Sequence, residues 1–155
     1  MVWPVDWDER VEGSACTMCT ADRPDESDAG LRVFAGDFTD AYLARRALVR
    51  GYVVVVWRGR HVVEPHHLTA DEAVEYNTDV LHVGRGVKGH FRPLKINYQT
   101  LGNRMPHLHT HVTPRYRDDP APGAPLPDGP NRPVPERQWR ADAQALRLRL
   151  GFKNS

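Results

Sequence analysis

Stretches in which polar and apolar residues alternate, the pattern of a half-buried β-strand, recur along this 155-residue chain. Residues 94–98 alternate in this way. Residues 31–35 are predicted to be a short strand ended by Gly36 and Asp37, and residues 53–57 are a valine-rich run typical of a central strand. Turn-forming residues at 100–104 connect the strand at 94–98 to another at 107–113. These last two strands are therefore predicted to form a hairpin.

A first segment with helical spacing opens on a capping box formed by Thr69 and Glu72. The spacing of apolar residues predicts a helix that runs to about Val83. We expect its inward face to contain Ala73, Tyr76 or Asn77, Val80 and Leu81. Its end is expected at the glycines that follow, Gly84, Gly86 and Gly89.

A last helix is predicted at 136–150, with Pro135 as a first-turn residue and Gly151 as the stop. Its inward face is expected to hold Trp139, Ala143, Leu146 and Leu150. Residues 118–135 contain a proline every two to five positions, which is typical of an extended strap with few hydrogen bonds. Too little chain follows for a second domain, so residues 1–117 and 118–155 are predicted to fold together as one.

Residues 38–50 are ambiguous. Helix-forming residues fill 41–48, whereas Gly36 and Asp37 just before them could close a hairpin. Local propensity by itself favours a helix here.

The charge and hydropathy of the chain exclude several classes of partner. The formal net charge is +1 and the pI is near 7.9, with acidic and basic residues interleaved. This balance gives no support for a broad nucleic-acid surface or a polybasic membrane patch. No apolar run approaches the ~20 residues of a membrane span, and the N-terminus lacks the layout of a signal peptide. We therefore expect a soluble cytoplasmic protein that binds neither nucleic acid nor membrane.

Three histidines, His107, His109 and His111, alternate with other residues. On a β-strand they would share one face at a spacing of roughly 6.6 Å, and Pro114 is expected to end that strand. Imidazole acts as a nucleophile, a proton donor or a metal ligand near neutral pH. Catalysis and metal binding therefore both remain open for this triplet.

The residues around the triplet indicate a ligand rich in charged oxygen atoms. Gly102 and Asn103 lie in a loop whose backbone amides could hold a phosphate or another oxyanion. Arg104 and Arg115 flank the histidines, and arginine pairs with phosphate in a forked geometry. Asn97 on the neighbouring strand could add an amide donor.

Cys16 and Cys19, the only cysteines of the chain, have the spacing of half a zinc site and also that of a redox pair. A redox pair would follow a strand, and residues 12–15 have no strand pattern. Zinc needs two further ligands. His61 and His107 are the best placed, with His66 and His67 in reserve.

Taken together, residues 107–113, His-Leu-His-Thr-His-Val-Thr, resemble the histidine triad signature of the HIT nucleotide hydrolases and transferases. The resemblance extends to residues 97–106 and 114–116, which are similar to the bacterial branch of the family. The Cys16/Cys19 pair and the valine strand that leads from Gly51 to His61 also match, so that roughly residues 16–117 are covered.

This resemblance implies a HIT-like α+β fold, with a five-stranded antiparallel sheet, one long helix and a C-terminal helix, and a homodimer whose sheets adjoin. Residues 1–117 would form the HIT domain with an N-terminal zinc knuckle, and residues 118–155 would belong to the same domain. In the family the segment that matches 41–44 is a strand, and this overrides the helix prediction from propensity.

The resemblance also implies an activity: a nucleoside phosphoramidate or a dinucleoside polyphosphate would be cleaved through a nucleotidyl-histidine intermediate, which releases a nucleoside monophosphate. His109 would attack the α-phosphorus, and His111 would bind phosphate oxygens and assist the leaving group. Phosphate-binding positions would be Asn97, Gly102, Asn103 and Arg104. A structural zinc would be held by Cys16, Cys19, His61 and His107.

Two positions depart from the family pattern. Asn103 stands where many members have glutamine, which shortens the contact to the leaving group. Ala44 takes the place of the ribose-binding aspartate, beside Arg45 and Arg46, so the sugar is hypothesised to be modified, phosphorylated or held differently. The alternatives are a non-catalytic nucleotide-binding module, a nucleotidyltransferase on an unusual substrate, and a metal-dependent enzyme that uses all three histidines as ligands.

Overall fold

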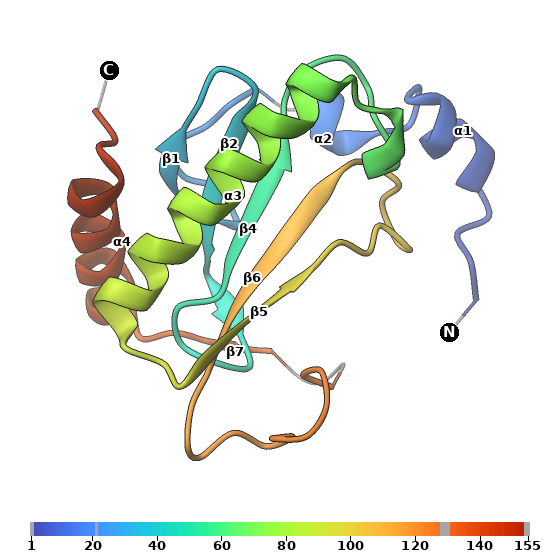
Figure 1. Ribbon diagram of the computed structural model, residues 1–155. Coiled ribbons are helices and arrows are strands. Elements are labelled where there is room, and N and C mark those ends of the chain that lie inside the picture. The colour runs from blue at the N-terminus through green and yellow to red at the C-terminus, as the bar shows by residue number, and fades with distance from the viewer. Residues whose placement is uncertain (1, 21, 128–130, 154–155) are drawn as a thin grey trace.

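Five strands pair into an antiparallel sheet in the order β1-β2-β4-β6-β5, and helix α3 lies across one of its faces (Figure 1). The computed structural model describes residues 2–20, 22–127 and 131–153. The sheet strands are β1 (Gly30–Ala35), β2 (Thr39–Ala44), β4 (Val53–Trp57), β5 (Lys95–Gln99) and β6 (His109–Arg115). This architecture confirms the expected α+β fold with one long and one C-terminal helix.

The remaining elements surround this sheet. They are α1 (Trp7–Glu12), α2 (Thr17–Thr20), β3 (Arg46–Ala47), the short 3-10 turn η1 (Pro65–His67), α3 (Ala70–Phe91), β7 (Arg132–Pro133) and α4 (Glu136–Leu150). Helix α4 packs at the β1 edge and against α3, and none of the described helices is long and apolar enough to cross a membrane (Figure 1).

Residues 39–44 form strand β2 although helix-forming residues continue beyond them. The helix prediction from propensity was wrong, and the strand implied by the family resemblance is correct. Ala41 and Leu43 are buried in the core, while β2 bonds to β1 on one side and to β4 on the other. These two ladders and the burial outweigh local propensity, which differs between states by less than about 1 kcal/mol per residue.

Helix α3 continues two turns beyond Val83, so the prediction that the glycines stop it was wrong. These glycines allow other elements to approach closely: a Cβ on Gly86 would lie 2.6 Å from Leu150 of α4. Gly84 meets the Tyr98 ring of β5 in the same way. The helix ends at Arg92, which adopts a left-handed conformation with φ of 50°.

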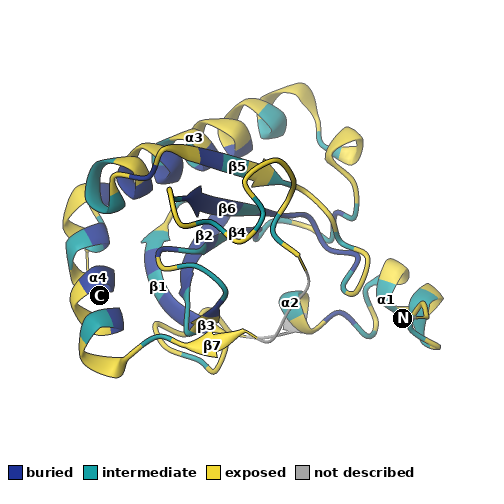
Figure 2. Ribbon diagram, turned by 90° about the horizontal axis from the view of Figure 1, so that it is seen from below, coloured by how far each residue is buried: buried dark blue, intermediate teal, exposed yellow. Residues whose placement is uncertain are grey.

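The inward face of α3 differs in part from the expected one. Tyr76 and Val80 are buried as predicted, whereas Asn77 is exposed and Leu81 is 48% exposed. The face continues through Val83, Gly84, Gly86 and Val87. Figure 2 shows this face turned toward the buried central strands. In α4, the buried residues include all four of the predicted ones, Trp139, Ala143, Leu146 and Leu150, and Gly151 ends the helix as expected.

Pro114 lies inside β6, opposite Ile96, and does not end the strand as predicted. The register explains why a proline is tolerated there. Strand β4 pairs with β6 only as far as Val112, so beyond that residue β6 has a neighbour on the β5 side alone. A missing N–H can then face away from the ladder without leaving a partner unsatisfied.

The proline-rich strap, residues 118–135, is described at 118–127 and 131–135, and both of these parts are bonded to the rest of the fold. Near its end β7 pairs with β3, and Val134 donates to the Arg45 carbonyl (Figure 2). Near its start, Arg115 donates to the Asp119 carboxylate and to the Ala121 carbonyl. Pro135 is the N-cap of α4 and lies one position before its first turn.

Candidate active site and metal site

The outer face of the sheet, opposite α3, presents His109 and His111. Alternation along β6 sends Thr110 the other way, where its hydroxyl bonds to Tyr76 of α3. The rings of His109 and His111 meet edge to face, with centroids 4.9 Å apart. Two imidazoles are thus fixed side by side on a central strand.

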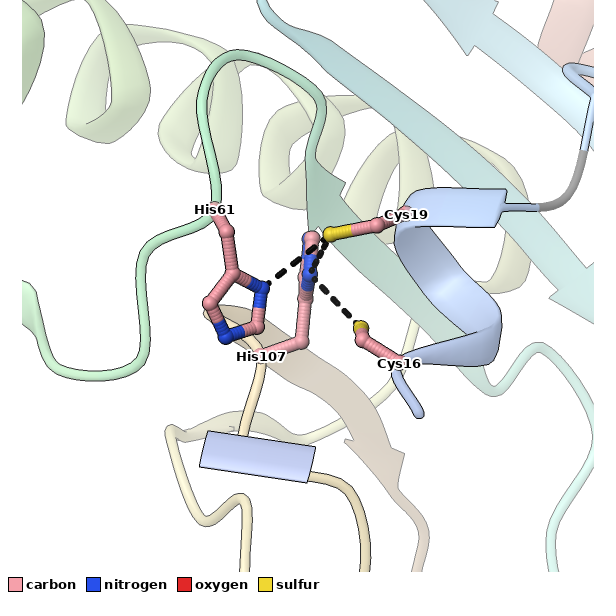
Figure 3. Close-up of side chains that lie close together, drawn as sticks. All are labelled: Cys16, Cys19, His61 and His107. Atoms are coloured by element: carbon pink, nitrogen blue, oxygen red, sulfur yellow. Dashed lines mark hydrogen bonds between the residues drawn. The ribbon is translucent and has the colours of Figure 1, made fainter. Parts of the chain in front are cut away.

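His107 lies just before β6 and belongs to a different group of side chains. Its Nε2 donates to the Trp57 carbonyl at 2.6 Å, which leaves Nδ1 as the acceptor. Nδ1 lies 3.4 Å from Sγ of Cys16 and 3.3 Å from Sγ of Cys19 (Figure 3). The three histidines therefore divide into one that faces the cysteines and two that do not.

Cys16, Cys19, His61 and His107 form a cluster that can hold a metal ion (Figure 3). One ligand atom from each lies within 4.8 Å of the other three, and Sγ of Cys19 is 3.1 Å from Nδ1 of His61. These separations are those of neighbouring ligands around one tetrahedral ion. Of the side chains in the described ranges, these alone form such a cluster, and His109 and His111 are not part of it.

The ligand atoms are oriented by bonds on their far sides. Nε2 of His61 donates to the Val11 carbonyl at 2.9 Å, so that both imidazoles turn Nδ1 toward the cysteines. Gly13, at φ +92°, passes so close to His61 that a Cβ would lie 3.1 Å from the ring. Burial lowers the pKa of His107 to about 4, which keeps this ring in the neutral form that binds metals.

The surroundings of Cys19, in contrast, favour the protonated thiol, which is not the form that binds a metal. Burial, together with the neighbouring Cys16, raises the pKa of the Cys19 thiol to about 11. The charge of Arg58 acts in the opposite direction, and a cation bound at the cluster would favour the thiolate form further.

One hydrogen bond sets the tautomer of the His109 ring. Its Nδ1 donates to the carbonyl of His107 at 2.6 Å, and Nε2 therefore carries the free lone pair. Burial lowers the pKa of His109, against the opposing effect of this hydrogen bond. The ring thus keeps its unprotonated nitrogen available near neutral pH.

His111 is fixed by Tyr52, a residue that the sequence analysis did not single out as functional. The Tyr52 hydroxyl lies 2.7 Å from Nδ1 of His111, and the two rings meet edge to face at 5.7 Å. Burial, and then the neighbouring His109, lower the pKa of His111 to about 4. Tyr52 directly follows Gly51, whose φ is +87°, at the entry to β4, and only the fold brings it to β6.

The residues expected to bind phosphate are divided between a loop and a strand. Gly102, with φ of +87°, Asn103 and Arg104 lie in the loop that leads from β5 to His107. Nη1 of Arg10 in α1 donates to the Arg104 carbonyl at 2.7 Å, which ties this loop to the N-terminal helix. Asn97 is in β5, on the same face as His111.

Position 44 is next to Tyr52, because the Ala44 amide donates to the Tyr52 carbonyl at 2.9 Å. Arg45 is already bound by the protein: it pairs with Glu26 and Glu136, and its guanidinium lies 4.2 Å from the Trp139 ring centroid. The described contacts therefore give no support for Arg45 as a ligand of a phosphorylated sugar.

The carboxylate that does lie on the outer face of β2 belongs to Asp40, which the sequence analysis did not mark. Its side chain is fully buried and is surrounded by three arginines, Arg23, Arg32 and Arg58. Arg58 also donates to the Met18 carbonyl of α2, between the two cysteines. Asp40 thus anchors the segment that carries the cysteines to the sheet.

Comparison with known proteins matches residues 31–118 to the model of the HIT domain family. A curated relative, the bis(5'-adenosyl)-triphosphatase of Saccharomyces cerevisiae (strain ATCC 204508 / S288c), is 28% identical over 89 residues. The match covers 54% of this chain and 43% of that protein, so it spans less than half the length of the curated relative.

Solved structures with a similar fold include three bacterial proteins. A histidine triad (HIT) protein from Sinorhizobium meliloti 1021 has a TM-score of 0.71 and 25% identity, over 87% of this chain and 99% of that one. A histidine triad protein from Bradyrhizobium japonicum has a TM-score of 0.72 and 21% identity, over 79% and 91%. A Zn-bound histidine triad family protein from Mycobacterium smegmatis has a TM-score of 0.66 and 19% identity, over 89% and 94%.

Proposed function

This chain belongs to the HIT domain family, whose model matches residues 31–118, and we propose that it is a nucleotidyl hydrolase. Its substrate would be a nucleoside phosphoramidate or a dinucleoside polyphosphate, cleaved at the α-phosphorus to release a nucleoside monophosphate. The observation that carries this proposal is the bond from Nδ1 of His109 to the His107 carbonyl. This bond leaves Nε2 as a fixed, neutral nucleophile beside a second imidazole.

In the first step, Nε2 of His109 forms a bond to the α-phosphorus, and the bond to the leaving group breaks with its electron pair. His111, held by Tyr52, would bind the phosphate oxygens and assist the departing atom. In the second step, water adds to phosphorus, the P–N bond breaks, and the nucleoside monophosphate is released with His109 restored.

Charge that develops on the phosphoryl oxygens requires fixed donors, which supply the largest contribution in such transfers. The backbone at Gly102 and the groups of Asn103 and Arg104 are proposed for this role, because their loop leads directly into the histidines. Asn97 on β5 is proposed as a further phosphate-side donor.

The cluster of Cys16, Cys19, His61 and His107 is proposed to bind zinc in a structural role. Two thiolates and two imidazoles are the donor set that zinc prefers, and four protein ligands leave no open position for a substrate. The Zn-bound relative from Mycobacterium smegmatis supports this choice of metal. When bound, the ion would supply a cross-link between α2, the loop after β4 and the start of β6.

Following the family resemblance, we further expect a cytoplasmic homodimer, whose mass can be measured by light scattering in solution.

The proposal is tested by measuring release of nucleoside monophosphate from a panel of adenosine and guanosine phosphoramidates and dinucleoside polyphosphates. His109→Ala should lose turnover by at least about 10³-fold, because no other side chain replaces the nucleophile. The matched control is His66→Ala, which removes an exposed imidazole whose ring contact is with His67, and it should leave rates unchanged.

Quenching in alkaline denaturant during turnover, which preserves a P–N bond, should trap a nucleotidyl group on the wild-type chain and none on His109→Ala. A wild type that binds these nucleotides but turns over none of them would instead establish the alternative, a non-catalytic nucleotide-binding module.

A further inference from the structure

The metal-binding cluster contains two thiols of unequal exposure. Cys16 is fully buried, whereas Cys19, one turn later in the chain, is exposed. Their sulfur atoms lie 3.4 Å and 3.3 Å from the same atom, Nδ1 of His107 (Figure 3). A reagent from solution can therefore reach the sulfur of Cys19, while the sulfur of Cys16 stays protected beside it.

The turn that joins the two cysteines allows them to bond to each other. The Cys19 amide donates to the Cys16 carbonyl at 3.1 Å, so residues 16–19 form one tight turn. The ligand atoms of both residues lie within 4.8 Å of each other. The α-carbons at the two ends of such a turn are roughly 5 Å apart, which is within the range that a disulfide spans. Rotation of the two side chains can then bring the sulfurs into bonding distance.

Cys19 also lines a cavity of about 440 Å³, which is ample for hydrogen peroxide or a small thiol. Arg58 lines the same cavity and places a positive charge near the Cys19 sulfur. Partly exposed sulfurs beside positive charge are the ones that oxidants attack. A sulfur that ligates a cation is moreover a thiolate, which is the form that reacts with a peroxide.

His107 connects this cluster to the proposed nucleophile. Its ring faces the cysteines through Nδ1, and its backbone carbonyl accepts from Nδ1 of His109 at 2.6 Å. On the other side of the ring, Nε2 donates to the Trp57 carbonyl. If the sulfurs bonded to each other, His107 would keep the bond to Trp57 and lose its place in the cluster. The carbonyl that sets the tautomer of His109 would then be held less firmly.

Resting on the proposed metal site and hydrolase function, we propose that Cys16 and Cys19 are an oxidative modification site. Hydrogen peroxide converts the pair to a disulfide, which releases the metal and lowers the turnover of the hydrolase. The pair is thus a target of oxidation, and its change of state is passed to His109 through His107.

The oxidation takes place in two steps that together remove two electrons from the sulfurs. The Cys19 thiolate attacks one oxygen of the peroxide, the O–O bond breaks, and hydroxide leaves with the electron pair, so that Cys19 becomes a sulfenic acid. The Cys16 thiolate then attacks this sulfur, the S–O bond breaks, and a second hydroxide leaves. The imidazoles of His61 and His107 remain, and two ligands are too few to hold the ion.

The test treats the isolated zinc-containing protein with hydrogen peroxide. We expect the number of titratable thiols to fall from two to none and one zinc ion per chain to pass to a colorimetric chelator. The peptide that contains both cysteines should lose the mass of two hydrogen atoms. Release of nucleoside monophosphate should fall in parallel by at least about tenfold, because a small displacement of a reacting group is costly. A dithiol reductant with added zinc should restore all four readings.

Cys19→Asp separates disulfide formation from other oxidative damage. A carboxylate also ligates zinc, so four donors remain, but the partner of Cys16 in the disulfide is gone. Under peroxide this variant should retain the metal and the turnover with which it starts. The matched control is Met18→Leu, which removes the oxidisable thioether between the two cysteines and should respond to peroxide as the wild type does.

Loss of turnover with both thiols intact would overturn the inference, and so would oxidation that a dithiol does not reverse. A disulfide that forms and releases zinc while turnover stays within about twofold would overturn it as well. An isolated protein without zinc would overturn the metal site and this inference with it. An inactive wild type would instead overturn the proposed function, and disulfide formation would still be tested, because the thiol, zinc and mass measurements need no substrate.

Discussion

The two ends of strand β6 are each tied to a segment outside the matched HIT region, and the chemistry differs between them. Ahead of the strand, His107 meets Cys16, Cys19 and His61 in a group of four donors. At the far end, Arg115 meets the Asp119 carboxylate, the Asn97 amide and the Ala121 carbonyl. His109 and His111 lie on the strand between these two attachments.

The two groups at the ends of β6 differ in how the charges of their side chains are balanced. With both thiols ionised, the Cys2His2 group would carry two negative charges that a bound cation would balance. The Arg115 group is complete without any addition, since cation, anion and amide all come from the chain. We therefore expect one end of β6 to depend on metal supply and the other to be independent of it.

The largest effect is expected from metal removal, which breaks only the first attachment. Treating the protein with a strong chelator, or introducing Cys16→Ser, should lower the free energy of unfolding by about 3–5 kcal/mol and Tm by roughly 10 °C. Calorimetry measures the shift, and amide hydrogen exchange should increase around residues 13–19 and 61 before it does around 115–121. An unchanged Tm in metal-depleted protein would contradict the assignment of a structural metal.

A smaller effect is expected from Arg115→Met, which breaks the second attachment. The Asp119 carboxylate would lose its partner, at a cost of about 1–3 kcal/mol, because a side chain that is only 2% exposed is left without its hydrogen bonds. Denaturant unfolding measures the loss, and metal content should not change. Arg117→Met, at an exposed neighbouring position, is the control and should be neutral.

The Arg115–Asp119 ion pair should make the stability of the protein depend on pH. The hydrogen bonds from Arg115 hold the pKa of the Asp119 carboxyl below its usual range. The stability that this ion pair contributes is therefore fully present above the pKa that Asp119 has in the unfolded chain. It is lost as the pH falls through the lower pKa of Asp119 in the folded protein. The difference in stability between wild type and Arg115→Met should stay constant from pH 7 to 5 and shrink below about pH 4. A difference that already vanished at pH 5 would argue against an ion pair.

Tyr52→Phe acts at His111, between the two ends of β6. It is expected to change stability least and to lower the rate of turnover. Loss of the hydroxyl removes the bond to Nδ1 of His111 and leaves the ring free to turn. We expect kcat to fall by about tenfold for substrates with poor leaving groups, while KM and Tm remain nearly unchanged. Substrates with good leaving groups should be less affected. An equal loss of kcat with all leaving groups would show that the role of Tyr52 is only to support the fold.

Much of the site chemistry can be predicted from the sequence because it is local. The spacing of His107, His109 and His111 and the Cys16/Cys19 pair marked the polar groups. The capping box at Thr69, confirmed by its two reciprocal bonds, and the stop at Gly151 depend only on neighbouring residues. The role of each histidine was implied by family resemblance and remains a proposal.

The rest was decided by contacts between distant parts of the chain. Which histidine faces the cysteines depends on Cys16, which is 91 residues away from His107. Helix α3 continues through its glycines because Tyr98 and Leu150 pack against them, and β2 is a strand because β1 and β4 pair with it.

Local sequence therefore determined which residue types were available and where helices could begin and end. Tertiary structure decided between conformations of similar local free energy, because burial and strand pairing contribute more than propensity does. It also brought together Tyr52 with His111 and Arg115 with Asp119, and placed the strap against β5.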